Sequence, residues 1–228
     1  MILGGLQKFS LVDYPGKTCA ILFTRGCNFR CPYCHNPELV WPEQYAPEIP
    51  LEGVLDFLRQ RRGLLEAVTI TGGEPTLQAD LPVVARAIKE MGFALKLDSN
   101  GSRPDLLREL IGAGLLDYVA MDVKAPFSKY ARVCGVDFAI EPIRESVALL
   151  LGGRVDYEFR TTVDRALLNE EDLFEIGKMI RGAEKYYLQR LNTFNTKVTN
   201  VKPGHEEDTW LRQAAEKLQR FVKVCEVR

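Results

Sequence analysis

The segment CAILFTRGCNFRCPYC at residues 19–34 joins a short apolar run to three closely spaced cysteines. The run Cys19–Thr24 carries only small, aliphatic and aromatic side chains before its final threonine, a pattern that favours a buried β-strand. Cys27, Cys31 and Cys34 follow with the spacing C-x3-C-x2-C. A strand that leads directly into potential metal ligands predicts a site at the carboxyl end of that strand.

The rest of the chain alternates between strand-like and helix-like segments, which predicts an α/β fold with a parallel sheet covered by helices. We expect six strand-helix units. Their strands lie at 19–24, 67–71, 94–98, 118–123, 155–163 and 186–191, and their helices at 51–62, 81–91, 104–113, 143–151, 170–180 and 209–221. The pattern alone fits a doubly wound sheet or a barrel. A complete eight-unit barrel takes about 250 residues, so six units predict a partial (β/α)6 barrel, open on one side.

One domain is expected over residues 1–228, with residues 1–18 leading into the first strand and residues 222–227 as a further edge strand.

Thirty Lys and Arg against 31 Asp and Glu give a formal charge of −1, which argues against nucleic acid or an anionic membrane as partner. No apolar stretch approaches the roughly 20 residues of a spanning helix, and no signal peptide is evident. We expect a soluble, cytoplasmic protein whose six cysteines are not three disulfides.

Polar residues recur where the predicted strands end. Because ligands bind at the carboxyl ends of parallel strands, these residues are expected to share one site with the cysteines. They are Gly72, Gly73 and Glu74 after the second strand, Asp98, Ser99 and Asn100 after the third, Asp122 and Lys124 after the fourth, and Arg160 on the fifth.

Several ligand sets fit the cysteine spacing. Zinc would need a fourth ligand, for which His35 is available but poorly placed directly after Cys34. The sequence from Cys31 to His35 also matches the c-type haem pattern C-x-x-C-H, which would leave Cys27 without a role. A buried structural trio of thiols is a further alternative. Three thiolates could instead hold a four-iron cluster, which would leave one iron with an open coordination position.

The motifs resemble a known superfamily. The C-x3-C-x2-C motif with Tyr33 before its last cysteine, followed by GGEP at residues 72–75, resembles the radical S-adenosylmethionine (SAM) enzymes. The segments LDSNG at 97–101 and MDVK at 121–124 are similar to the branch that activates glycyl-radical enzymes. The opening FSLVDYPGK at 9–17 resembles the anaerobic ribonucleoside-triphosphate reductase activating proteins. The resemblance covers nearly the whole chain and implies the partial barrel of the radical SAM type.

The resemblance also implies a set of site residues. Three cysteines would hold a [4Fe-4S] cluster whose open iron chelates SAM, and Glu74 would bind the cofactor's ammonium group. Glycine in the GGEP motif would let the backbone approach without a Cβ in the way. The cluster ligands are Cys27, Cys31 and Cys34, and the cofactor contacts are Tyr33, Gly72, Gly73, Glu74, Asp98, Ser99, Asn100, Asp122, Lys124 and Arg160. Lys124 and Arg160 could alternatively be the cations of strand-end ion pairs.

The activity implied by this resemblance is reductive cleavage of SAM, followed by removal of a hydrogen atom from a backbone glycine of a partner enzyme. The implied partners are a glycyl-radical enzyme, in particular the anaerobic ribonucleotide reductase, and an electron donor such as a flavodoxin or ferredoxin. Two alternatives stay open at this point. One is a radical enzyme with a small-molecule substrate, and the other is a non-catalytic iron-sulfur or zinc module.

Overall fold

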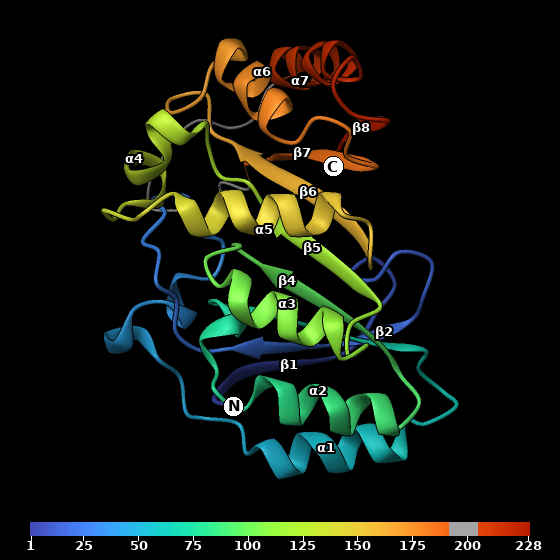
Figure 1. Ribbon diagram of the computed structural model, residues 1–228. Helices are drawn as coiled ribbons and strands as arrows, with labels where there is room; N and C mark the ends of the chain where they lie inside the picture. Colours follow the sequence, from blue (N-terminus) through green and yellow to red (C-terminus); the bar gives the residue numbers. More distant parts are fainter. Residues whose placement is uncertain (192–204) are drawn as a thin grey trace.

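Eight strands form one sheet in the computed structural model, which describes residues 1–191 and 205–228 (Figure 1). Strands β2 to β8 are parallel in chain order, and β1 pairs with β2 in the antiparallel direction. The strands are β1 (Leu3–Ser10), β2 (Cys19–Thr24), β3 (Ala67–Gly72), β4 (Ala94–Ser99), β5 (Tyr118–Asp122), β6 (Asp156–Val163), β7 (Lys185–Arg190) and β8 (Val224–Val227).

Helices follow the parallel strands from β2 to β7, as the alternation predicts. Figure 1 shows α1, α2, α3, α5 and α6 in chain order along one side of the sheet, with α7 beside α6 and the short α4 set apart at the left of the view. The helices α1, α2, α3, α5 and α6 bury apolar side chains against the sheet, as Val54 and Leu58 do in α1. The helices are α1 (Leu51–Gln60), α2 (Leu81–Glu90), α3 (Pro104–Gly112), α4 (Tyr130–Cys134), α5 (Glu141–Leu151), α6 (Glu170–Met179) and α7 (His205–Leu218).

The predicted partial barrel is confirmed, because the sheet is not closed. Within the described ranges, β1 pairs only with β2 and β8 only with β7. The edge strand expected at 222–227 is present as β8.

One strand and one α-helix were not predicted. Residues 1–18 were expected only as a lead-in, but Leu3–Ser10 forms strand β1. The strand lacks the alternation of apolar and polar residues by which a strand is recognised, because it contains two glycines and three consecutive exposed residues at positions 7–9. The short helix α4 was also missed, since five residues are too few to show a helical period.

The two faces of the sheet differ. Leu95 and Leu97 of β4 are fully buried in the main core, whereas Lys96 and Asp98 point to the opposite face because side chains alternate along a strand. On the interior face a small apolar cluster, which includes Tyr14 and Cys19, lies near the start of the parallel strands. The polar part of the barrel interior is therefore at their carboxyl ends. No helix in the described residues is long and apolar enough to span a membrane.

Candidate functional site

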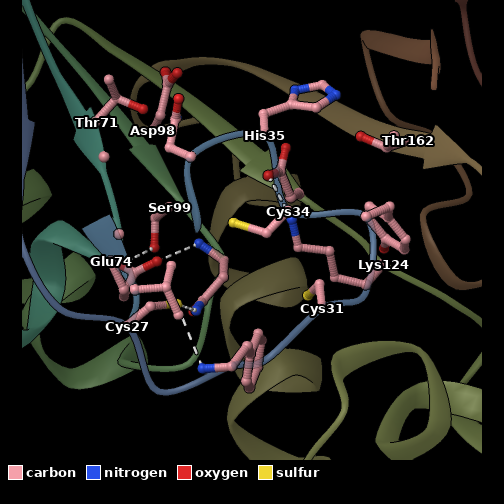
Figure 2. A pocket seen from close by; sticks show the side chains of 18 of the residues that line it. Cys27, Cys31, Cys34, His35, Thr71, Glu74, Asp98, Ser99, Lys124 and Thr162 are labelled. Atoms are coloured by element: carbon pink, nitrogen blue, oxygen red, sulfur yellow. Dashed lines mark hydrogen bonds and ion pairs between the residues drawn. The ribbon is translucent and has the colours of Figure 1, made fainter. Parts of the chain in front are cut away.

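The carboxyl ends of the parallel strands surround a cavity of about 220 Å³. All the site residues predicted from the sequence line it. They are Cys27, Cys31, Tyr33, Cys34, Gly72, Gly73, Glu74, Asp98, Ser99, Asn100, Asp122, Lys124 and Arg160. In the view of Figure 2, Cys27 and Glu74 lie on one side of the pocket, Cys31 and Lys124 on the other, and Cys34 between them.

The two glycines of the GGEP motif hold the β2 and β3 loops together. Gly72 has a φ of 120°, and a Cβ on either glycine would collide with the backbone, at Thr24 for Gly72 and at Gly26 for Gly73. The Gly73 N–H donates to the Thr24 carbonyl at 2.9 Å, and the Glu74 N–H donates to the Gly26 carbonyl at 2.7 Å. The structure thus gives these glycines a different physical reason from the expected approach to a cofactor, namely the close approach of two loops.

This close approach predicts a stability effect. Gly73→Ala is expected to lower the free energy of unfolding by roughly 1–3 kcal/mol, the usual cost of overpacking. Gly53→Ala is the matched control, because a Cβ at Gly53 in α1 meets nothing within 4 Å, and it should stabilise by roughly 0.5–1 kcal/mol. Urea unfolding of both variants measures the difference. Equal stability of the two variants would contradict the proposed contact.

The cysteine loop is fixed by hydrogen bonds to its own backbone. Arg30 Nη1 donates to the carbonyl oxygens of Cys27 at 2.6 Å and of Phe29 at 2.8 Å, and its guanidinium lies 4.9 Å from the Trp41 ring centroid. The Cys27 sulfur accepts hydrogen bonds from Phe29 N at 3.4 Å and from Asn100 Nδ2 at 3.9 Å. Burial raises the pKa of Cys27 to about 12, so ionisation of this thiol in the metal-free protein is disfavoured.

A fourth cysteine lies beside this loop. Cys134, to which the sequence gives no recognisable role, ends helix α4 and is fully buried. Its carbonyl accepts a 2.7 Å hydrogen bond from Arg30 N. A hydrogen bond between the two thiols lowers the pKa of Cys31 and raises that of Cys134. Helix α4 therefore supports the cysteine loop through its last residue, which contacts both Arg30 and Cys31.

Glu74 is a buried carboxylate that is bonded only to neutral donors. Its Oε1 accepts hydrogen bonds from Thr76 N at 3.1 Å, Thr76 Oγ1 at 2.5 Å and Ser99 Oγ at 2.9 Å. Its Oε2 accepts one from Asn100 N at 2.7 Å. No cationic side chain pairs with it in the described residues, and burial raises its pKa. A buried carboxylate without a counter-ion gains from a cationic ligand.

The opposite wall of the cavity, called the cationic wall, carries the two cations Lys124 and Arg160, each paired with aspartate. Lys124 Nζ lies 2.8 Å from Asp122 Oδ2, and Arg160 bridges Asp122 and Asp98 at 2.9 and 3.2 Å. Burial alone would raise the pKa of both aspartates, but the positive charges of Arg160 and its lysine neighbours outweigh it and hold both pKa values below the usual range. The strand-end ion pair considered as an alternative is therefore present, and its members also line the cavity.

Some lining residues were not predicted as site residues. Thr71, Thr162, Gln189 and His35 lie around the cavity, and Thr162 Oγ1 donates to Gln189 Oε1 at 3.5 Å. Threonine and glutamine near strand ends are too common to single out from one sequence. The Tyr33 hydroxyl is buried and has no hydrogen-bond partner in the described residues.

The donor set also bears on the kind of metal group that fits. In the described residues, no three Cys, His, Asp or Glu side chains converge on one metal-ion position. A four-iron cluster does not need such convergence, because each thiolate binds a different iron. Three thiols on one loop therefore fit a cluster. The buried carboxylate of Glu74 and the unpartnered hydroxyl of Tyr33 line the same cavity.

Comparison with known proteins identifies the class. The family model of the radical SAM superfamily matches residues 21–181, so the chain belongs to this superfamily and is a radical SAM enzyme. The family implies a [4Fe-4S] cluster and SAM. A Methanocaldococcus jannaschii protein named as a glycyl-radical enzyme activating enzyme is 35% identical over 195 residues, 83% of this chain and 79% of its own length. The pyruvate formate-lyase-activating enzyme of Clostridium pasteurianum is 30% identical over 132 residues, 54% of each chain. These relatives support the glycyl-radical activase branch.

Solved structures show the same fold. Streptococcus suis SuiB matches with a TM-score of 0.70 at 16% identity, over 91% of this chain and 48% of SuiB. A domain of a pyruvate-formate lyase-activating enzyme from Bacteroides vulgatus matches with a TM-score of 0.56 at 16% identity, over 72% of this chain and 99% of that domain. The chain thus spans about half the length of SuiB and nearly all of the second structure.

Proposed function

We propose that this enzyme cleaves SAM reductively and generates a glycyl radical on a partner enzyme, the anaerobic ribonucleoside-triphosphate reductase. One observation carries the proposal: a single cavity combines a three-cysteine loop, a buried carboxylate without a counter-ion and a cationic wall. Such a cavity complements the amino-acid moiety of SAM. The carboxylate of Glu74 suits its ammonium group, the cationic wall suits its carboxylate, and a cluster held by the cysteines can bind both groups.

In this proposal Cys27, Cys31 and Cys34 hold a [4Fe-4S] cluster and leave one iron open. Glu74 binds the methionyl ammonium group through a charge-assisted hydrogen bond. The four neutral hydrogen bonds that Glu74 accepts fix the orientation of its carboxylate, so little further ordering is needed when the ammonium binds.

The cationic wall binds the methionyl carboxylate, with Lys124 and Arg160 as its direct contacts. Asp122 and Asp98 hold those two cations in place through the ion pairs described above. The remaining proposed contacts with the cofactor's ribose and adenine come from Tyr33, Ser99 and Asn100, which line the same cavity.

When bound, the reduced cluster supplies the electron that breaks the C5′–S bond of SAM. The chain's own contribution is to position the cofactor and to exclude water. Phe29 and Tyr33 are 2% and 3% exposed beside the cysteine loop, and both line the cavity. Such shielding favours radical chemistry, because it keeps water and oxygen from the reacting atoms.

The proposed partner is supported by three observations. The relatives' names assign them to glycyl-radical enzyme activation, and the unclosed sheet leaves a side from which a loop of another protein can reach the cavity. The third observation is the resemblance of segment 9–17 to the reductase activating proteins, and the reductase assignment rests on it. This segment lies near Cys19, at the end of the strands away from the cavity. A flavodoxin or ferredoxin is the proposed electron donor.

The test uses the reconstituted enzyme with dithionite, SAM and an anaerobic ribonucleoside-triphosphate reductase under argon. We expect 5′-deoxyadenosine together with an electron paramagnetic resonance doublet on the reductase, which collapses to a singlet when its glycine is deuterated at Cα. Pyruvate formate-lyase is the matched alternative partner. A radical on pyruvate formate-lyase alone would refute the reductase assignment, and 5′-deoxyadenosine without a radical on either protein would indicate a small-molecule substrate.

A further inference from the structure

A buried lysine lies beneath the cationic wall and does not line the cavity. Lys96 follows Leu95 in β4 and points to the barrel interior, on the same face as Asp98. Its side chain is 4% exposed, and its Nζ lies 2.6 Å from Asp98 Oδ1. Burying an ammonium group is costly unless a negative charge compensates it. The ion pair with Asp98 therefore allows Lys96 to stay charged in this buried position.

Lys96 completes a chain of ion pairs with alternating sign. Asp98 holds Lys96 through Oδ1 and Arg160 through Oδ2, and Asp122 holds Arg160 through Oδ1 and Lys124 through Oδ2. Each aspartate thus uses both carboxylate oxygens. The chain contains three cations and two carboxylates, so its formal charge is +1.

The excess charge depends on Lys96. Without it, the remaining two cations and two carboxylates sum to zero, and Asp98 would be left to Arg160 alone. Arg160 is 12% exposed and Lys124 is 15% exposed, so the wall is poorly screened by water. In such a setting one unit of net charge has a large effect on the binding of an anion.

We propose that Lys96 is a positioning residue for cofactor binding. Its ammonium group neutralises Asp98, so that Arg160 and Lys124 present a net positive charge to the carboxylate of the cofactor's amino-acid moiety. This inference rests on the proposed function, which assigns that carboxylate to Lys124 and Arg160. It adds a residue that touches neither the cofactor nor the cavity.

The test compares two ligands in the reconstituted, unreduced protein, with dissociation constants from equilibrium dialysis under argon. SAM carries the carboxylate, and 5′-methylthioadenosine lacks the whole aminocarboxypropyl group and, with it, the positive charge on sulfur. Lys96→Met keeps the side-chain length and removes the charge. We expect the Kd for SAM to rise about ten-fold, the effect of about 1.4 kcal/mol, while the Kd for 5′-methylthioadenosine changes by less than about two-fold.

Two further variants make the outcome decisive. Lys89→Met removes a lysine whose ion pair with Asp117 is partly exposed and away from the cavity, and both constants should stay at wild-type values. Lys124→Met tests the proposed carboxylate site itself. If Lys124→Met changes the ratio of the two constants and Lys96→Met does not, this inference is wrong and the proposed function stands. If neither variant changes the ratio, the proposed carboxylate site is wrong as well. An equal rise of both constants in Lys96→Met would show a merely structural role and also overturn the inference.

Discussion

Replacing Cys31 by alanine is expected to abolish both cluster binding and reductive cleavage of SAM. Cys31 is one of the three thiols on the loop that lines the cavity, and its thiol also interacts with that of Cys134. Loss of outer-shell partners of metal ligands already costs 10–100-fold, so removal of a ligand should lower the rate more than about 100-fold. Iron content after anaerobic reconstitution and 5′-deoxyadenosine formation measure the two effects.

Cys225→Ala is the matched control. Cys225 is a buried free cysteine in β8 that does not line the cavity, so iron content and cleavage should remain at wild-type values. Retention of iron and of cleavage by Cys31→Ala would contradict the cluster site. Stoichiometric zinc without cleavage in the wild-type protein would support the zinc alternative instead.

Replacing Glu74 by glutamine is expected to weaken SAM binding roughly 30- to 100-fold, or about 2–3 kcal/mol, because a charge-assisted hydrogen bond to a buried carboxylate becomes a neutral one. The substitution keeps the side-chain size. In the ligand-free protein two effects on stability oppose each other. Loss of the buried charge is favourable, whereas the new amide would face the donor Asn100 N, which now bonds Oε2. Equilibrium dialysis of the reconstituted protein measures the binding change.

Glu184→Gln provides the control for this substitution. Glu184 is about half exposed and pairs with Lys223 at the surface, so SAM binding should not change. A thermal unfolding curve of Glu74→Gln shows whether the fold is kept. Wild-type affinity in a folded, reconstituted Glu74→Gln protein would refute the assignment of Glu74 to the ammonium group.

The fold and the cavity lining were largely predictable because their signals are local. Parallel strands such as β2, buried in five of six residues, appear as short apolar runs. The residues at the end of each run must meet at one edge of the sheet, which is why Glu74 and Asp98 were expected to share one site.

The unpredicted features depend on contacts between distant segments. Lys96 is one polar residue in an alternating strand, and the sequence around it does not indicate that its ammonium group is buried against Asp98. Cys134 is 103 positions from Cys31 along the chain, and only the placement of α4 brings the two thiols together. The role of Gly73 likewise depends on the backbone at Gly26, a contact with no sequence signature of its own.

The backbone contact between the GGEP motif and the cysteine loop has a thermodynamic consequence. Glu74 N bonds the Gly26 carbonyl, and Asn100 bonds both Glu74 and the Cys27 sulfur. The two ligand sites therefore cannot be ordered independently of each other. Linkage then requires reciprocity: whatever factor the cluster adds to the affinity for SAM, SAM adds to the affinity for the cluster. Under the proposed function, a cluster that raises the affinity for SAM implies that SAM, when abundant, shifts the equilibrium toward the cluster-loaded protein.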